Sequence, residues 1–227
     1  GILYCNNDYR LYCSINFIMI EIKNISKSFG DKNILKNISL NIKNRDNLVV
    51  IGQSGVGKSV LLKHINGLLK PDEGNVFIDS VKINKLSFSK KQTVRKKMSM
   101  VFQFGALFDS MTVKNNILLA LDNLTKLTKD EKNERIKEVL YQVNLENIED
   151  SYPHDISGGM RKRVGIARAI AIHPKYILYD EPTTGLDPIT TDTISQLINN
   201  ISKKQKNTSI IVTHDMKIVN EVANKVI

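Results

Sequence analysis

The stretch Gly52–Ser59, GQSGVGKS, is the feature that most restricts what this chain can fold into. It has the spacing G-x-x-x-x-G-K-[ST], follows the apolar run NLVVIG, and precedes a helical pattern that begins near Lys58 and ends before Pro71. A strand, a glycine-rich loop and a helix are the context that this spacing requires. Glycines let successive N–H groups point into one concavity, where the helix N-terminus adds positive potential. The sequence therefore predicts a phosphate-binding loop. Lys58 would reach the β and γ phosphates of a nucleotide, and the Ser59 hydroxyl would bind Mg²⁺.

Two carboxylates, Asp180 and Glu181, follow the apolar run of residues 176–179. Charges at the end of a buried strand need a cation or a hydrogen-bonded partner, because burying them alone is costly. A strand beside the phosphate loop would let Asp180 hold Mg²⁺ from the side opposite Ser59. Glu181, one residue on, would face the space where a water attacks the γ phosphate. We regard a solvated surface role for Glu181 as the weaker alternative, because an apolar strand precedes it.

Strands and helices alternate along the chain from residue 19 onwards. β-Branched runs predict strands at 20–25, 34–42 and 76–78, with turns at 29–31 and 71–74. Runs at 176–179 and 209–212 predict buried strands on either side of a helix, which has apolar residues at helical spacing: Ile194, Leu197, Ile198 and Ile201. Strand, crossover helix and strand imply a parallel sheet covered on both faces.

A helical insert is expected at about 104–170, within a domain that covers 19–227. Thr112 can cap one helix, and Thr128 with Glu131 forms a capping-box pattern. Residues 1–18 lack the regular pattern that begins at Met19 and do not resemble a secretory signal. We interpret them as an extension without a function of its own; a short regulatory arm is the alternative.

Composition excludes several classes of protein. Of 227 residues only Cys5 and Cys13 are cysteines, so neither a disulfide framework nor a metal cluster is expected. No apolar stretch approaches the roughly 20 residues that span a bilayer. The chain has 33 Lys+Arg against 23 Asp+Glu, a net charge of +10, but the basic residues are scattered. We therefore attribute the charge to compositional bias and expect no nucleic-acid partner.

Three further stretches narrow the function. ISGGMRKR, residues 156–163, places Ser157 at a helix N-cap with two glycines behind it, which predicts a second anion-binding helix end. Within one chain this second anion-binding site would be redundant, because the phosphate loop already provides one. Gln103 follows a short strand at the start of the helical insert, and His214 follows the apolar strand SIIVT.

In these motifs and their order, the chain from about Ile20 to its end resembles the ATP-binding cassette (ABC) ATPases. Residues 52–59 are similar to the Walker A loop, 157–159 to the signature motif, 176–181 to Walker B and 185–187 to the D-loop; Gln103 resembles the Q-loop residue and His214 the switch histidine. The resemblance implies an α/β P-loop NTPase fold with a mostly parallel core sheet, an N-terminal antiparallel β part and a helical subdomain.

The resemblance also implies a set of site residues for ATP and Mg²⁺. Catalysis would use Glu181, His214 and Lys58, and Mg²⁺ would bind at Ser59, Gln103 and Asp180. Nucleotide binding would involve the aromatic Phe29, which would stack on adenine. It would also involve the phosphate loop and the residue that follows the loop, which are Gly52, Gln53, Ser54, Gly55, Val56, Gly57, Lys58, Ser59 and Val60. The signature motif would contribute Ser157, Gly158 and Gly159, and the D-loop would contribute Asp187.

Two identical chains facing head to tail would complete each other's ATP sites. Such a dimer would drive an integral membrane permease from the cytoplasmic side of the inner membrane, to which it would bind peripherally. The stretches FQFGALFDSMTV and YPHDISGGMRKRVGIARAIA resemble the ATPase of Mla/Mce-type phospholipid transporters, which would add an Mce-domain lipid-binding partner. Met160 suits that group, whereas Ile156 departs from the usual leucine, and relatives continue beyond Ile227.

Other functions were weighed against lipid transport. An importer of amino acids or other small solutes is the alternative cargo class. An ABC protein acting on nucleic acid or ribosomes would need a coiled-coil insert or a second cassette, and this sequence has neither. A non-enzymatic ATP-gated module conflicts with the presence of Lys58, Asp180, Glu181 and His214.

Overall fold

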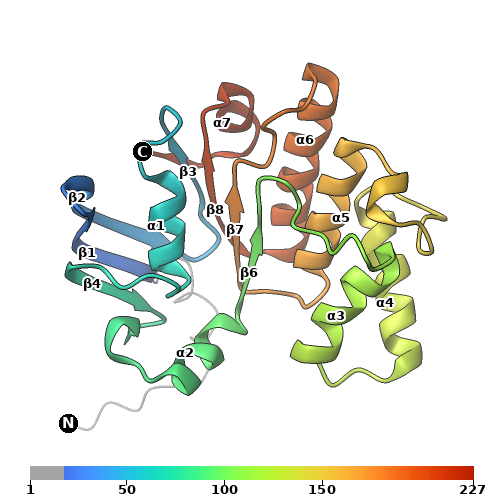
Figure 1. Cartoon of the computed structure of the whole chain (residues 1–227), viewed down its shortest axis with the longest axis horizontal. Helices are drawn as coiled ribbons and strands as arrows, with labels where there is room; N and C mark the ends of the chain where they lie inside the picture. The colour runs from blue at the N-terminus through green and yellow to red at the C-terminus, as the bar shows by residue number, and fades with distance from the viewer. Residues whose placement is uncertain (1–17) are drawn as a thin grey trace, which may run out of the picture.

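The structure, a computed structural model, describes residues 18–227. The interpretation of the N-terminal extension, including Cys5 and Cys13, lies outside this range except at Ile18, which begins the first strand. Figure 1 shows an antiparallel β part and a helical part on opposite sides of a central parallel sheet.

The antiparallel sheet has four strands in the order β2-β1-β4-β5. They are β1 (Ile18–Phe29), β2 (Lys32–Lys43), β4 (Glu73–Ile78) and β5 (Val81–Lys82). β1 and β2 are longer than the predicted strands, because an antiparallel hairpin keeps pairing through polar residues when one face is open to water. A register shift between Ile22 and Ile25 interrupts the pairing at Asn24, which has a φ of +48°.

The central sheet has five parallel strands in the order β6-β7-β8-β3-β9. They are β6 (Met98–Val101), β7 (Tyr176–Asp180), β8 (Thr208–Thr213), β3 (Asn47–Ile51) and β9 (Lys225–Val226). The predicted strands at 176–179 and 209–212 are therefore both present and are hydrogen-bonded neighbours.

Helices cover the sheet and build the region after β6. They are α1 (Lys58–Ile65), α2 (Phe88–Arg95), α3 (Val113–Leu124), α4 (Lys129–Gln142), α5 (Gly158–Ile170), α6 (Pro188–Gln205) and α7 (Met216–Val222), with short 3-10 turns at Ile83–Lys85 and Pro153–Asp155. Thr112 caps α3, and Thr128 and Glu131 form the capping box of α4. No helix within residues 18–227 is long and apolar enough to span a bilayer.

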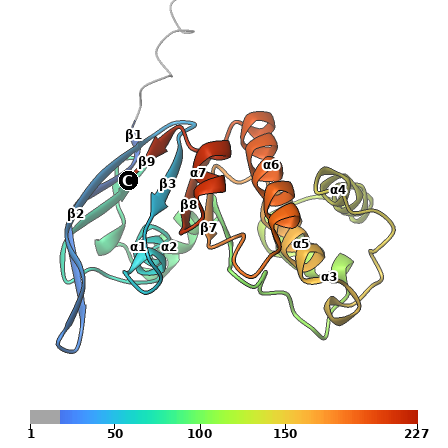
Figure 2. The same cartoon turned by 90° about the horizontal axis from the view of Figure 1, so that it is seen from above.

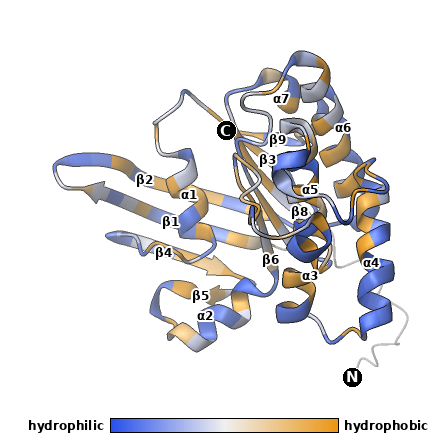
Figure 3. Cartoon of the chain, turned by 45° about the vertical axis from the view of Figure 1, so that its right-hand side comes forward, coloured by the Kyte–Doolittle hydropathy of each residue, from blue (hydrophilic) through white to orange (hydrophobic). Residues whose placement is uncertain are grey.

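Alternate residues of the central strands enter two different cores. Ile177, Tyr179 and Ile211 pack with α3, α4, α5 and α6, whereas Tyr176, Leu178 and Ile210 pack with α1 and the antiparallel sheet. Figure 2 shows the antiparallel sheet, the central sheet and the helices α5 and α6 from above. Figure 3 shows that α4 is largely hydrophilic, in keeping with the single face that it buries: Arg135, Ile136, Val139 and Leu140.

Asp79, in the turn between β4 and β5, connects the two sheets. Its carboxylate accepts hydrogen bonds from Lys97 Nζ at 2.7 Å, Lys175 Nζ at 2.5 Å and the Tyr176 hydroxyl at 2.5 Å. Burial by itself raises the pKa of Asp79, but these three donors outweigh it and lower the pKa to about 2. The carboxylate is therefore held ionised between the two sheets.

The parallel arrangement brings together loops that are distant in the sequence. The strands β3, β6, β7 and β8 end at the same edge of the sheet, and the segments that follow them begin near Gly52, Phe102, Glu181 and His214. Ligands of open α/β sheets bind outside the carboxyl ends of the strands. This edge is consequently where the candidate site lies.

Candidate functional site

The loop between β3 and α1 owes its shape to glycines. Gly55 and Gly57 have φ values of +83° and +103°, which side-chain-bearing residues rarely adopt. A Cβ on Gly57 would also lie only 2.7 Å from Ile34 Cγ2. The loop can therefore pass tightly over β2 and enter α1 at Lys58, which leaves the first N–H groups of the helix available to a ligand.

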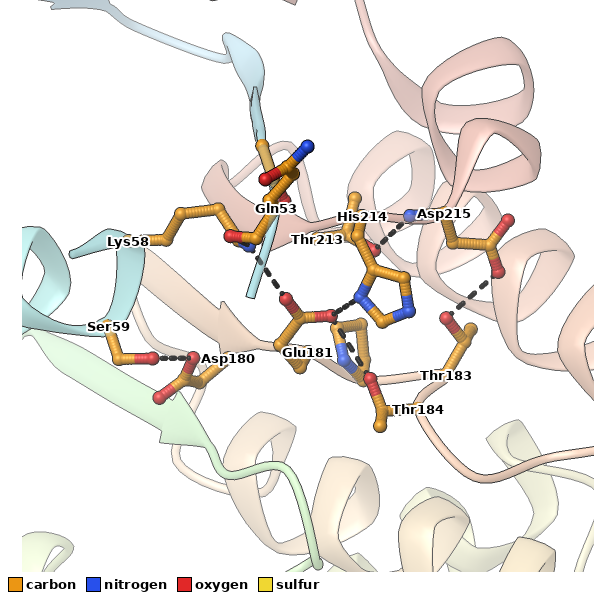
Figure 4. A network of polar contacts seen from close by, with 12 residues as sticks. Gln53, Lys58, Ser59, Asp180, Glu181, Thr183, Thr184, Thr213, His214 and Asp215 are labelled. Atoms are coloured by element: carbon orange, nitrogen blue, oxygen red, sulfur yellow. Dashed lines mark hydrogen bonds and ion pairs between the residues drawn. The ribbon is translucent and has the colours of Figure 1, made fainter. Parts of the chain in front are cut away.

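Lys58 is buried at the base of this loop, with 6% of its side chain exposed. Its Nζ donates to the carbonyl oxygens of Gly52 at 2.6 Å and Gln53 at 2.9 Å. The same Nζ lies 3.1 Å from Glu181 Oε1. The ammonium is thus fixed by the loop's own backbone and paired with the carboxylate from β7, as Figure 4 shows.

Ser59 and Asp180 form a second contact between the same two elements. The Ser59 hydroxyl donates to Asp180 Oδ1 at 2.6 Å (Figure 4). Both groups are oxygen ligands of the kind that Mg²⁺ prefers, and Mg²⁺ is usually bound by one or two such groups together with substrate phosphates and water. The pair beside the phosphate loop therefore fits the predicted metal position.

Glu181 is the most connected residue of the site and has a left-handed backbone, with a φ of +49°. Its N–H donates to the Val212 carbonyl of β8 at 2.9 Å. Its Oε2 accepts from the Thr184 hydroxyl at 3.0 Å and lies 2.8 Å from His214 Nδ1. Such a backbone costs about 1–3 kcal/mol in a non-glycine residue, so the surrounding contacts must hold it. They turn the carboxylate from the end of β7 toward Lys58 and His214 (Figure 4).

These residues surround one pocket of about 270 Å³. Its lining includes Lys58, Glu181 and His214, together with Gln103 and Phe29. The other predicted residues that line it come from the loop and the start of α1: Ser54, Gly55, Gly57, Ser59 and Val60. The structure thus brings the end of β1, the phosphate loop, the start of the helical region, the end of β7 and the end of β8 to one place.

Four other predicted residues of the phosphate loop and β7 lie outside the lining: Gly52, Gln53, Val56 and Asp180. Gly52 and Gln53 contribute carbonyl oxygens to Lys58, and Asp180 contacts the pocket through Ser59. Val56 is 52% exposed. Phe29, by contrast, lines the pocket; it is 49% exposed, and Lys27 Nζ lies 5.3 Å from its ring centroid.

The signature motif and the D-loop are not part of this pocket. Ser157 caps α5 by accepting from the Met160 N–H, and Asp187 caps α6. Thr190 of α6 lies close to both motifs: a Cβ on Gly159 would lie 2.8 Å from Thr190 Cγ2, and the Thr190 hydroxyl donates to Asp187 Oδ2 at 2.6 Å. Gly158 and its neighbours therefore belong to a separate surface formed by the starts of two helices.

The sequence interpretation missed three residues that contact or support the site. Ile34 and Thr184 line the pocket, and Lys162 of α5 donates to the Pro182 carbonyl at 3.0 Å and the Thr184 carbonyl at 2.5 Å. Burial lowers the pKa of Lys162 to about 8, and the nearby charge of Glu181 opposes that shift. Helical spacing could have indicated Lys162, because Ile166 and Ala169 follow it at i+4 and i+7 on the same buried face.

Fold and site together define a P-loop nucleotide-binding domain, with a lysine and a serine from the loop facing two carboxylates at the end of the neighbouring strand. The chain belongs to the ABC transporter family, whose model matches residues 35–184. The predicted fold class and the family are therefore both confirmed.

Relatives share most of this chain. It is 42% identical to the methionine import ATP-binding protein MetN of Clostridium tetani over 208 residues, 92% of this chain and 65% of that protein. It is 44% identical to the probable amino-acid import ATP-binding protein YxeO of Bacillus subtilis over 211 residues, 92% of this chain and 84% of that protein. The chain spans 62% to 65% of the length of the methionine import relatives.

A solved relative shows the same fold. The dimeric ATP-binding cassette MJ0796, in a post-hydrolysis state bound to ADP and Pi, superposes with a TM-score of 0.81 at 36% identity. The match covers 88% of this chain and 90% of that one.

Proposed function

We propose that this chain is the ATP-hydrolysing subunit of an ABC transporter that imports amino acids or similar small solutes. The observation that carries the ATP-hydrolysis part of the proposal is the convergence of Lys58, Ser59, Asp180, Glu181 and His214 on one edge of the sheet. A cation for the phosphates, two oxygen ligands for Mg²⁺, a carboxylate and a histidine are what hydrolysis of a nucleoside triphosphate requires.

Each residue has a role that follows from its position. Lys58 and the N–H groups of the loop would bind the phosphates, and Ser59 and Asp180 would hold Mg²⁺. Mg²⁺ held by these two residues would supply positive charge that balances the negative charge developing on the phosphate oxygens. Glu181 accepts a hydrogen bond from the attacking water and polarises it, while His214 contacts the γ phosphate. Phe29, which lines the pocket, would stack on adenine. Gln103, at the start of the helical region, would contact the metal and relay the nucleotide state to that region.

Nucleotide binding must rearrange the contacts around Lys58. The ammonium is shared among the Gly52 carbonyl, the Gln53 carbonyl and Glu181. Phosphate oxygens compete for the same donor, so their arrival frees the Glu181 carboxylate to face water. Lys58 thus holds the Glu181 carboxylate in an ion pair until the phosphates take its place beside the ammonium.

A second copy of the chain would complete the site. The surface formed by Ser157, Gly159 and Asp187 lies outside the chain's own pocket, so head-to-tail pairing is a way to bring it to a nucleotide. The dimeric state of the related ATP-binding cassette supports this arrangement. ATP would then hold two copies together, and hydrolysis would release them.

The cargo proposal follows the relatives. The names of two relatives that match 92% of this chain refer to methionine and amino-acid import. They favour the alternative in the sequence interpretation over phospholipid transport and give no support to an Mce-domain partner. The partners would be an integral permease and a solute-binding protein, with this chain bound peripherally on the cytoplasmic side of the inner membrane.

The hydrolysis proposal is tested with Glu181→Gln. A lost general base lowers kcat by about 100- to 10,000-fold. The variant should still bind ATP and accumulate as an ATP-bound dimer in size-exclusion chromatography. Asp122→Asn, which removes an exposed pair with Lys132, serves as the control and should hydrolyse ATP like the original chain. Phosphate release by Glu181→Gln at the original rate would overturn the role of Glu181.

The cargo proposal needs a separate experiment. The tagged chain is purified with its membrane partners, and the co-purifying proteins are identified by mass spectrometry. Recovery of a multi-spanning permease with a solute-binding protein supports amino-acid or small-solute import. Recovery of an Mce-domain protein instead would overturn that cargo class and leave the ATPase proposal intact.

A further inference from the structure

Lys162 is a buried cation that faces the backbone immediately after Glu181. It lies on α5, five residues beyond Ser157, and is only 7% exposed. Its Nζ donates to the carbonyl oxygens of Pro182 and Thr184, the first and third residues after Glu181. One ammonium therefore fixes both ends of the turn 182–184.

The same turn controls the Glu181 carboxylate. The carbonyl of Thr184 accepts from Lys162, and the hydroxyl of Thr184 donates to Glu181 Oε2 at 3.0 Å. The Thr184 N–H also donates to the Glu181 carbonyl at 3.3 Å. Two hydrogen bonds thus link the α5 ammonium to the carboxylate, through a single intervening residue.

The strained backbone of Glu181 makes the position of its carboxylate depend on the anchor that Lys162 provides, meaning its two hydrogen bonds to the Pro182 and Thr184 carbonyls. A φ of +49° persists only where neighbouring contacts hold it, and the Pro182–Thr184 turn is the segment that leaves this residue. A misplacement of about 1 Å at a reacting group can cost about 100-fold in rate. An anchor on the turn therefore affects where the carboxylate points, in addition to how stable the chain is.

Arg163, the next residue of α5, also donates to two backbone carbonyls, but those carbonyls have no link to Glu181. Its guanidinium donates to the carbonyl oxygens of Val143 at 3.3 Å and Asn144 at 2.8 Å, just beyond the end of α4. Like Lys162 it satisfies two backbone carbonyls from the same helix, but its partners do not contact Glu181. It is therefore a matched control for loss of a two-carbonyl anchor.

We propose that Lys162 is a positioning residue for ATP hydrolysis, which fixes the Pro182–Thr184 turn so that Thr184 holds the Glu181 carboxylate toward the attacking water. The proposal rests on the ATPase function proposed above and adds a residue to it. Lys162 lies on α5, the helix that Ser157 caps. It therefore connects the surface that would face a second copy of the chain with the Glu181 carboxylate of its own site.

The first test separates kcat from KM. Lys162→Met keeps the apolar stem but loses both donors, and it should lower kcat for ATP about 10- to 100-fold while KM changes less than about twofold. Lys162→Gln retains an amide donor and should recover part of the loss. Arg163→Met should keep the original kcat. Equal kcat in the Lys162→Met variant and the original chain, or equal losses in Lys162→Met and Arg163→Met, would overturn the proposal.

A double-mutant cycle tests the route through Thr184 and still decides if Lys162→Met does not fold. Thr184→Val removes the hydroxyl bound to Glu181 and leaves the carbonyl bound to Lys162. If Lys162 acts through Thr184, the fold-loss of kcat in the Lys162→Gln/Thr184→Val double variant is smaller than the product of the fold-losses in the two single variants. Fully multiplicative losses would refute the route. An original chain without ATPase activity would instead refute the proposed function itself.

Discussion

Replacing Asp79 with asparagine tests whether one carboxylate holds the two sheets together. Its pKa of about 2, against an ordinary value of 3.8, corresponds to roughly 2 kcal/mol of stability. The side chain keeps 18% exposure and its lysine partners are nearly half exposed, so solvent screening lowers the expected contribution to about 1 kcal/mol. Asp79→Asn should lose this amount at neutral pH, because an amide does not carry the charge that Lys97 and Lys175 surround.

The pH dependence gives the sign of the effect. The pKa of Asp79 is lower in the folded chain than in the unfolded chain, so its contribution is complete above about pH 4 and disappears as pH falls through 2. The free energies of unfolding of the original chain and Asp79→Asn should therefore converge, with about half of the difference gone near pH 3.

The measurement is urea unfolding followed by circular dichroism at several pH values between 7 and 3. Asp192→Asn, which removes an exposed pair with Lys217, is the control and should cost well under about 1 kcal/mol at neutral pH. A constant difference between the original chain and Asp79→Asn across this range would refute the reasoning. It would mean that Asp79 stabilises the chain by packing or by neutral hydrogen bonds, independently of its charge.

Two further predictions concern the candidate site. Gly159→Ala should lower ATPase activity several-fold, because the added Cβ would lie 2.8 Å from Thr190 Cγ2; adding Thr190→Ser removes that methyl group while keeping the hydroxyl bound to Asp187, and should restore the activity. No recovery in the double variant would contradict the steric explanation. Ser59→Ala should raise the Mg²⁺ concentration for half-maximal hydrolysis about tenfold or more, because it removes the hydroxyl paired with Asp180. A Mg²⁺ titration of ATPase activity checks this, and an unchanged midpoint would exclude Ser59 as a metal ligand.

Much of the fold could be read from local patterns. The glycine spacing before Lys58 predicts the loop because its φ angles suit glycine, and the apolar runs at 176–179 and 209–212 predict buried strands because both faces of a parallel sheet are covered. The lengths of β1 and β2 were underestimated, since pairing continues through polar residues such as Lys27 and Asn33 that have no strong strand preference.

The candidate site was predictable as a set of residues but not as a network. The motifs indicate Lys58, Glu181 and His214, yet nothing local indicates that Glu181 takes a φ of +49° or that Thr184 donates to it. A residue with several partners can satisfy its charge in more than one way, and only the packed structure selects among them.

The sequence by itself determined the phosphate loop, the acidic strand end and the order of the motifs, because each depends on residues that are neighbours along the chain. The tertiary structure alone decided that Lys58 pairs with Glu181, that Lys162 fixes the turn beyond it, and that the signature motif lies away from the chain's own pocket. The physical reason is that these contacts depend on how the parallel strands and α5 pack in space, which no local pattern of residues encodes.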